Sequence, residues 1–229
     1  MLMRFMSTRA RRALQLCVTV LILIQPHAFS ASSRALSSRP ARHKHSVPQE
    51  PASANAPSPK EAERLIAGRA RQVILALKAG NIGKLATFVH PQKGVRFSPY
   101  ASVLPDEDRV VKKNQLAQMW ASNTRYKWGA YDGSGDPIRL TFKKYHRRFI
   151  FDHDFANAKS VRYNGEVMGH GNTLNNVRAI YPGAIAVEHY FPGFDPKFDG
   201  MDWRSLWLVF EKKGNEWYLV GIVHDEWTI

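Results

Sequence analysis

Two long, aromatic-rich segments near the end of the chain constrain the fold more than any other feature. They span Trp203–Lys212 and Glu216–Trp227, on either side of Gly214-Asn215. Alternation with a period of two around a short glycine-containing turn predicts an antiparallel hairpin. Its two faces are both apolar for much of their length, with Leu206, Leu208 and Phe210 on one and Trp207 and Val209 on the other. The hairpin therefore belongs to a sheet that is covered on both sides, or that curls around a pocket.

Helix signals come before the hairpin. Ser58-Pro59-Lys60-Glu61 matches a capping box with proline at the first helical position, and apolar residues then recur at helical spacing up to Gly80. Asn81 is placed to cap a short second helix that runs through Val89. Further predicted elements are strands at Val95–Phe97 and Ile185–Phe191 and helices at Lys113–Asn123, Thr141–Phe151 and Thr173–Tyr181.

This order of elements predicts an α+β fold in a single domain over residues 59–229. Helices dominate its first part and three consecutive antiparallel strands close the chain. We therefore expect the helices to pack on one face of a strongly curved, cone-like antiparallel sheet. Of the 26 aromatic residues, 24 lie within residues 88–229, which indicates one core there.

The first 30 residues have the pattern of a secretory signal peptide. Four arginines precede the apolar run Ala13–Ile24, and small residues at 28 and 30 favour cleavage before Ala31. The apolar run is shorter than the roughly 20 residues that a bilayer span needs; an uncleaved membrane anchor is the alternative. Cleavage between Ser30 and Ala31 predicts an exported protein, periplasmic or extracellular, with no stable transmembrane segment after processing. Cleavage would also remove Cys17, and a single cysteine excludes a disulfide framework or a cysteine-based zinc site.

Residues 31–58 have the composition of a disordered linker. Proline, serine and alanine dominate, no aromatic residue is present, and Leu36 and Val47 are the only apolar side chains larger than alanine. Such a segment buries too little surface to offset the entropy of ordering it.

The formal net charge of +14 first suggests a nucleic-acid partner. However, +4 of it lies in the signal peptide and +3 in the linker, which leaves +7 on residues 60–229. A basic cluster at Lys143–Arg148 is expected to be a solvated face or to contact anionic envelope components. Because an exported protein rarely meets DNA, we expect no nucleic-acid partner.

Four motifs resemble a family of uncharacterised bacterial exported proteins over residues 65–229. They are His90–Tyr100 (HPQKGVRFSPY), Trp128–Gly135 (WGAYDGSG), Asp195–Leu206 (DPKFDGMDWRSL) and Trp217–Ile229 (WYLVGIVHDEWTI). The family implies no reaction. The order of elements is also similar to the nuclear transport factor 2-like cone shared by SnoaL-type cyclases and ketosteroid isomerases. The isomerases' catalytic carboxylate and oxyanion donors match no position in this sequence, so no catalytic residue follows from the resemblance.

The end of the last predicted strand carries the strongest candidate for acid–base chemistry. His224 and Asp225 lie there, and a cone would bring them near Glu188 of the preceding strand. A histidine beside carboxylates can serve as a general base. His224 with Asp225 or Glu188 is therefore the candidate catalytic set; a histidine hydrogen-bonded at a strand end is the alternative.

A candidate ligand-binding set lies around the hairpin. Arg204 offers a planar fork to a carboxylate and Trp203 an apolar wall. His189 and Tyr218 complete the set. The alternative is an internal ion pair between Arg204 and an aspartate of the preceding loop.

No metal or cofactor is expected. Tyr131–Asp136 resembles a calcium loop but lacks the EF-hand spacing and its closing glutamate. Asp152-His153-Asp154 also suggests metal ligands, yet adjacent side chains diverge on a regular element, and no HExxH pair is present. The sequence contains no GxSxG elbow, GxGxxG motif or Walker loop.

Together these features predict an exported domain that binds a small-molecule or cell-envelope ligand in the cavity of its curved sheet. Whether it is an enzyme stays open. The first alternative is a hydrolase- or isomerase-type enzyme that uses His224 with Asp225 or Glu188. The second is an association module that pairs through its sheet, as a homodimer.

Overall fold

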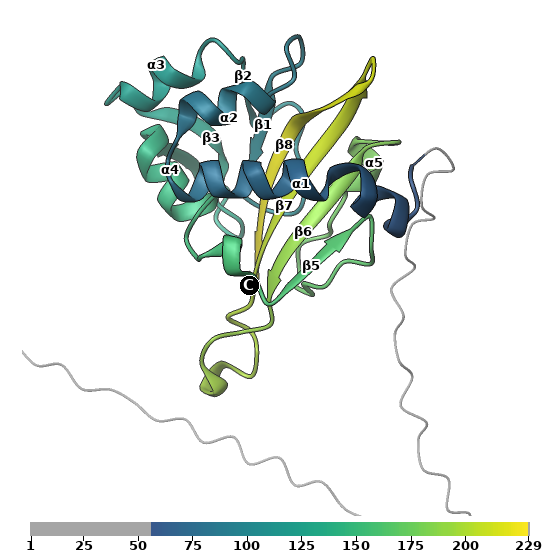
Figure 1. The fold of residues 1–229 in the computed structure, drawn as a ribbon. Coiled ribbons are helices and arrows are strands. Elements are labelled where there is room, and N and C mark those ends of the chain that lie inside the picture. The colour runs from purple at the N-terminus through teal and green to yellow at the C-terminus, as the bar shows by residue number, and fades with distance from the viewer. Residues whose placement is uncertain (1–55, 229) are drawn as a thin grey trace, which may run out of the picture. The chain divides into compact units, whose positions relative to one another are not determined.

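A computed structural model describes residues 56–228 (Figure 1). The predicted signal peptide and all but the last three residues of the predicted linker lie outside the described residues. Within them, no helix is both long and apolar enough to cross a membrane. The helices are α1 (Pro59–Lys78), α2 (Ile82–Phe88), α3 (Leu116–Ala121), α4 (Phe142–Phe149) and α5 (Val177–Ile180), with 3-10 turns η1 (Phe155–Asn157) and η2 (Pro196–Phe198). The strands are β1 (Val95–Ser98), β2 (Arg109–Val111), β3 (Tyr126–Ala130), β4 (Pro137–Leu140), β5 (Ser160–Tyr163), β6 (Ile185–Phe191), β7 (Arg204–Lys213) and β8 (Glu216–Glu226).

Six strands form one sheet in the order β2-β1-β8-β7-β6-β5, and β3 and β4 form a separate pair. The predicted hairpin is β7 and β8, whose ladder runs from Arg204 opposite Glu226 to Lys213 opposite Glu216. On its other side β8 pairs with β1, and these two strands are parallel. The last strand of the chain therefore lies in the interior of the sheet.

The helix starts form as their local sequences predict. The Ser58 hydroxyl accepts a hydrogen bond from the Glu61 backbone N–H at the start of α1, and the Asn81 side chain accepts one from Lys84 at the start of α2. Each bond satisfies a backbone donor that the first turn leaves free. Prediction of these two helices is confirmed to within two residues.

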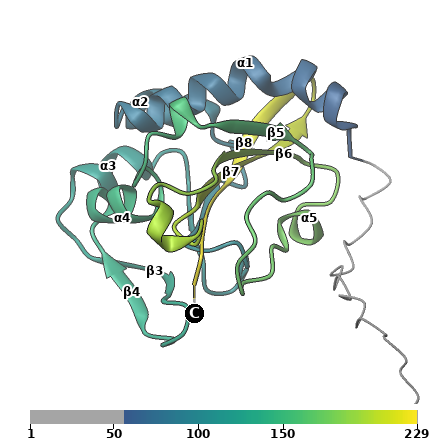
Figure 2. The same ribbon diagram turned by 90° about the horizontal axis from the view of Figure 1, so that it is seen from below.

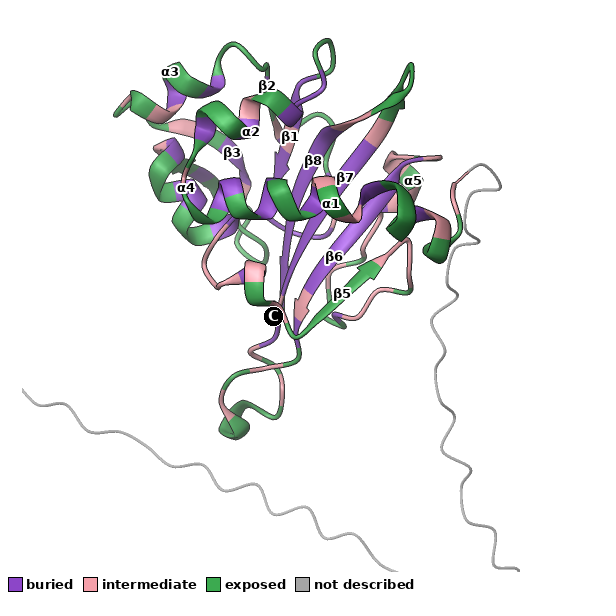
Figure 3. Ribbon diagram, viewed as in Figure 1, coloured by how far each residue is buried: buried purple, intermediate pink, exposed green. Residues whose placement is uncertain are grey.

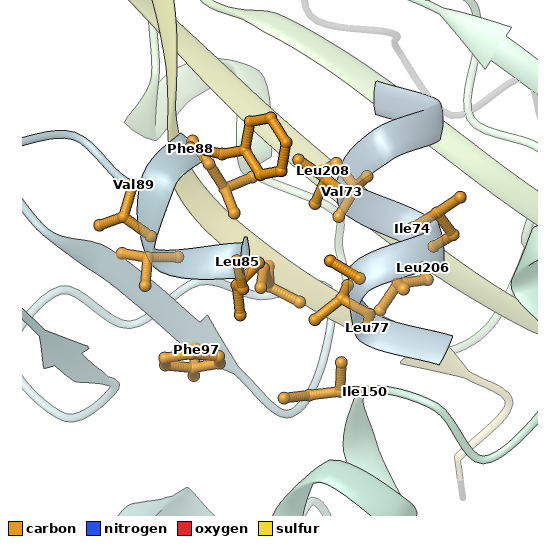
Figure 4. Close-up of a cluster of buried hydrophobic side chains, with 14 of the residues drawn as sticks. Val73, Ile74, Leu77, Leu85, Phe88, Val89, Phe97, Ile150, Leu206 and Leu208 are labelled. Atoms are coloured by element: carbon orange, nitrogen blue, oxygen red, sulfur yellow. The ribbon is translucent and has the colours of Figure 1, made fainter. Parts of the chain in front are cut away.

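Side chains from α1, α2 and α4 cover one face of the six-stranded sheet, called here the helix face. Figure 4 shows the contact between the two N-terminal helices and β7. Phe97 of β1 lies in the same core, edge-on to Trp128 of β3 and to Phe142 and Tyr145 of α4. Burial of each such side chain contributes about 1.5–3 kcal/mol. The core members drawn in Figure 4 include Val73, Ile74, Leu77, Leu85, Phe88, Leu206 and Leu208.

The opposite face, called here the loop face, is covered by residues 164–184. Figure 2 shows α1 and α5 on opposite sides of the sheet. Val177, Ile180 and Tyr181 of this segment belong to a second apolar cluster. Its other buried members are Val103, Ala184, Ala186, Trp207, Val209, Val220 and Val223. Because both faces are covered, β6, β7 and β8 are buried along most of their length (Figure 3).

The α+β class is confirmed, but three finer predictions are wrong. The helices do not all lie on one face of the sheet, because α5 packs on the loop face. The sheet is mixed rather than antiparallel, because β1 runs parallel to β8. It is also not strongly curled: side chains of the helices fill the helix face solidly, and the edge strands β2 and β5 remain at opposite ends of the strand order. Strands β2 to β5 were not predicted, and α3 and α5 are shorter than the segments predicted for them.

Candidate functional site

The ladder of the central strands decides which polar side chains can meet. Residues directly opposite each other in a ladder point to the same face, and successive residues along a strand point to opposite faces. His189, Leu206 and His224 form one rung across β6, β7 and β8. The next rung holds Tyr190, Ser205 and Asp225, and the preceding rung holds Glu188, Trp207 and Val223.

The three residues of the candidate catalytic set are divided between the two faces of the sheet. His224 lies edge-on to Phe149 of α4, which places it on the helix face. Glu188 accepts a hydrogen bond from the Met168 backbone N–H, which places it and Asp225 on the loop face. The sheet therefore separates His224 from both carboxylates and does not form the acid–base set that the sequence predicts.

The candidate ligand-binding residues are likewise dispersed. Arg204 lies on the helix face, whereas Trp203 packs on the loop face, beside Tyr190 and over Gly169. His189 shares the helix face with His224, but Leu206 stands between them. Tyr218 lies edge-on to His90, eight residues from Glu226 along β8 and roughly 26 Å away at the rise of a strand.

His224 instead meets a carboxylate that lies far away in the sequence. Its Nε2 is 3.3 Å from Asp152 Oδ2, in the loop that follows α4, and its Nδ1 is 3.3 Å from the carbonyl oxygen of Pro99. The side chain is fully buried. A neutral imidazole donates from one nitrogen only, whereas the cationic form can donate to both oxygens.

Two arginines complete the group around His224. Arg204 Nε lies 3.2 Å from Asp152 Oδ2 and 3.3 Å from Glu226 Oε2. Arg148 of α4 donates to the other oxygen of Glu226 at 2.5 Å. We call the set Arg148, Asp152, Arg204, His224 and Glu226 the His224 cluster. It lies on the helix face, where β7 begins and β8 ends, close to the C-terminus in Figure 1.

The His224 cluster is partly closed to water. Glu226 and Asp152 expose 6% and 13% of their side chains, while Arg148 exposes 45%. Burial raises the pKa of Asp152, but the hydrogen bond and charge of His224 and the charges of His153 and Arg204 outweigh it, so the pKa lies below its ordinary value. Oδ1 of Asp152 is buried without a partner among residues 56–228.

Three members of the cluster have atoms suited to a divalent cation. The ligand atoms of Asp152, His224 and Glu226 lie within 4.8 Å of one another. Arg204 Nε, however, already lies within 3.3 Å of both carboxylates, and Arg148 supplies the second positive charge that balances them. A metal ion at this point would have to displace the guanidinium, so these residues fit an ion-pair network better than a metal centre.

Glu188 and Asp225 form a second polar group, the acid pair, on the loop face. Glu188 is fully buried, and its carboxyl accepts hydrogen bonds from Ser205 Oγ at 2.8 Å and from the Met168 N–H at 3.1 Å. Burial raises the pKa of Glu188 to about 7, although these hydrogen bonds act in the other direction. Burial and the charge of Glu188 raise the pKa of Asp225 well above its ordinary value. A proton is therefore held here near neutral pH.

Two signals in the sequence could have found the His224 cluster. Along a strand, residues two apart share a face, so Glu226 rather than Asp225 is the neighbour of His224. Asp152 was noticed only as part of a possible metal motif, and its contact with His224 spans 72 residues. Arg148 was assigned to a solvated basic face; its neighbours Lys143, Lys144 and Arg147 are exposed in this way.

Comparison with known proteins adds little. No protein-family model and no curated protein matches the chain. One solved structure that is similar is a candidate calcium/calmodulin-dependent protein kinase II association domain from Xanthomonas campestris, 14% identical, with 79% of this chain and 97% of that chain covered and a TM-score of 0.30. A likeness at this level carries no argument, so both family resemblances stay predictions.

Proposed function

We propose that the domain binds a small carboxylate-bearing ligand at the His224 cluster. The observation that carries the proposal is the pair of partly exposed guanidinium groups, Arg148 and Arg204, which flank a buried histidine. Both contact Glu226, one on each oxygen, so they lie side by side. A planar guanidinium fork matches the two oxygens of a carboxylate.

Both arginines keep N–H groups for a ligand. Arg204 uses Nε for the two carboxylates and Nη1 for the backbone oxygens of Asp202 and Trp203, which leaves Nη2 without a partner among residues 56–228. Arg148 uses Nη2 for Glu226, and its Nε and Nη1 have no partner in the same part of the chain. These are the donors that a ligand carboxylate would engage.

The charge of the cluster also favours an anion. Two arginines balance Asp152 and Glu226, and His224 has an acceptor at each ring nitrogen. An incoming carboxylate would meet the N–H groups of Arg148 and Arg204 that have no partner among residues 56–228. A buried ion network adds little to stability, because the cost of removing its charges from water offsets their attraction. Its presence therefore supports a role in binding.

Thermal shift measurements test the proposal with the protein expressed from the full-length sequence. Benzoate and succinate should raise the melting temperature in a saturable manner, whereas benzamide and succinamide should not. Arg204→Lys, which removes the fork, should weaken binding about tenfold or more. Arg71→Lys, on the exposed face of α1, is the matched control and should bind as the native protein does. Equal responses to acids and amides, or to phosphate and carboxylates, would contradict the proposal.

An enzyme of the hydrolase or isomerase type is the second candidate. The observation that favours it is the contact of His224 Nε2 with Asp152 Oδ2; for His224 to act as a general base, its Nδ1 would have to leave the Pro99 carbonyl oxygen. Glu188 and Asp225 take no part in it. Turnover that is lost in His224→Gln, with carboxylate binding retained, would favour this candidate over simple binding.

Export, an envelope ligand and homodimer formation belong to the same proposal. Their support is the signal-peptide pattern, the basic charge and the sheet edges, respectively. N-terminal sequencing of the protein released by its host should start at Ala31, and an intact Met1 would overturn cleavage. Sizing chromatography at high concentration should give a dimer, and a monomer would rule out the association module.

A further inference from the structure

The positive charge of the domain is gathered in one part of the chain. Residues 109–148, from the start of β2 into α4, contain ten basic and two acidic residues and carry +8, whereas residues 60–229 as a whole carry +7. Only two of the ten basic residues, Lys127 and Arg148, form an ion pair within the described part of the chain. The charge of this part is therefore largely left for a partner outside the domain.

Five of these cations gather where β4 leads into α4, and we call them the basic corner. Arg125 Nε donates to the carbonyl oxygen of Arg139 at 3.0 Å, at the open end of the β3–β4 ladder. Helix α4 begins three residues later; Lys143 and Lys144 lie in its first turn and Arg147 in its last. All five residues are exposed, and in Figures 1 and 2 α4 lies on the side of the domain away from α5.

Stability does not explain this arrangement. The first turn of a helix favours acidic side chains and disfavours cations, yet Lys143 and Lys144 lie there and no acid does. Arg147 follows these two lysines by four and three residues, spacings at which like charges on a helix repel each other. The sequence between Asp136 and Asp152 contains no acidic residue that could neutralise them. Residues that oppose local stability in this way are typical of a binding surface.

The aromatic rings beside the basic corner argue against single-stranded nucleic acid, whose bases stack on open aromatic faces. Lys143 Nζ lies over the ring of Trp120, 6.0 Å from its centre, and the Arg109 guanidinium lies over the ring of Tyr126 at 5.2 Å. The Trp120 ring also packs against the end of α1, where a Cβ atom on Gly80 would stand 3.2 Å from it. The corner therefore offers charge rather than stacking platforms.

We propose that the basic corner binds the surface of a membrane that contains anionic phospholipid. Clusters of four to eight lysines and arginines are typical of proteins that bind such surfaces, and each cation near the headgroups strengthens binding about fivefold. The apolar side of α4, with Phe142, Tyr145 and Phe149, is buried in the core, so the contact is electrostatic and stays at the headgroups. The inference deepens the proposal of an envelope ligand and does not depend on carboxylate binding at the His224 cluster.

Lysine footprinting of the protein expressed from the full-length sequence tests the proposal. Vesicles made of equal parts phosphatidylcholine and phosphatidylglycerol should slow acetylation of Lys143 and Lys144 about fivefold or more, and vesicles of phosphatidylcholine alone should not. The effect should fade as the salt concentration approaches about 1 M, because salt screens exposed charges. Lys60, exposed at the start of α1, is the internal control and should react equally in both. Mass spectrometry reads each lysine separately, so binding through residues 1–55 does not imitate the result.

Two double variants separate the basic corner from net charge. Arg125→Gln with Arg139→Gln should raise the vesicle concentration that half-protects Lys143 and Lys144 about tenfold or more. Lys212→Gln with Lys213→Gln removes the same charge at the exposed β7–β8 turn and should raise it less than about twofold.

Equal shifts in the two double variants, or no protection of Lys143 and Lys144, would overturn the proposal. Stronger protection by inorganic polyphosphate than by vesicles at equal phosphate would also overturn it, in favour of a soluble polymer. The arginine double variant should keep the thermal response to benzoate, so a failure here is distinguishable from a failure of carboxylate binding at the His224 cluster.

Discussion

Replacement of Glu188 by glutamine should stabilise the protein at high pH and leave it almost unchanged at low pH. Glutamine has the shape and hydrogen-bonding pattern of a protonated glutamate, so it can keep the contacts with Ser205 and Met168. The native carboxyl is fully buried, and at high pH it must carry a charge there. Glu188→Gln removes that charge without removing the side chain.

The magnitude follows from the pKa of Glu188, which burial raises from 4.5 to about 7. The folded state holds this proton more tightly than the unfolded chain does. Its contribution to stability is therefore fully present below pH 4.5 and is lost as the pH rises to about 7. The difference of two and a half pH units corresponds to about 3 kcal/mol. Glu188→Gln should match the native protein near pH 4.5 and exceed it by about this amount at pH 8.

Urea denaturation at constant ionic strength between pH 4.5 and pH 8 measures the difference between the two proteins. Subtraction cancels the titrating groups that Glu188 does not influence, among them His189, whose pKa burial lowers to about 4. Asp225 does not cancel, because the charge of Glu188 contributes to its raised pKa. Glu166→Gln, an exposed glutamate in the same loop, is the control and should give a difference that does not vary with pH. A pH-independent difference for Glu188→Gln would refute the role of the buried carboxyl.

Three further outcomes are expected from denaturation experiments. Gly169→Ala should lower the free energy of unfolding by about 1–3 kcal/mol, because the added Cβ would stand 2.3 Å from the Trp203 ring. Gly68→Ala has open space around it in α1 and should raise the free energy of unfolding by about 0.5–1 kcal/mol. Asp152→Asn should destabilise the protein at neutral pH by an amount that shrinks as the pH falls below 3.8, because a lowered carboxyl pKa gives stability that acid removes; a deficit that persists in acid would contradict this. Phe97→Ala should lower the free energy of unfolding by about 3–5 kcal/mol and Phe198→Ala, which is exposed, by no more than about 0.5 kcal/mol; equal losses would place Phe97 outside the core.

The helices and strands that the sequence predicted correctly are those set by short-range features, namely helix caps and the alternation of apolar residues. Caps at Ser58 and Asn81 marked the starts of two helices, and alternation marked β6, β7 and β8. Edge strand β5 was not predicted because it is mostly exposed and lacks the apolar alternation of a buried strand. The parallel pairing of β1 with β8 joins segments more than 120 residues apart, and no local pattern encodes it.

In the candidate site too, the sequence identified single residues but not the contacts between distant segments. Sequence reasoning found His224 and Arg204 as residues of interest, but it joined His224 to carboxylates that alternation sends to the other face. The actual partner, Asp152, comes from the loop after α4. Its place beside His224 depends on how α4 packs against Phe97 and the sheet, which is a property of the tertiary structure.

The interior position of β8 has a consequence for the order of folding. A chain that emerges N-terminus first from the ribosome presents β1 and β2 long before β8, the strand that joins them to the rest of the sheet. Until residues 216–226 emerge, β1 lacks its parallel neighbour and β7 lacks its hairpin partner. Contacts between such distant segments form slowly. The six-stranded sheet can therefore be completed only when the final eleven-residue strand, β8, is available to pair with both β1 and β7.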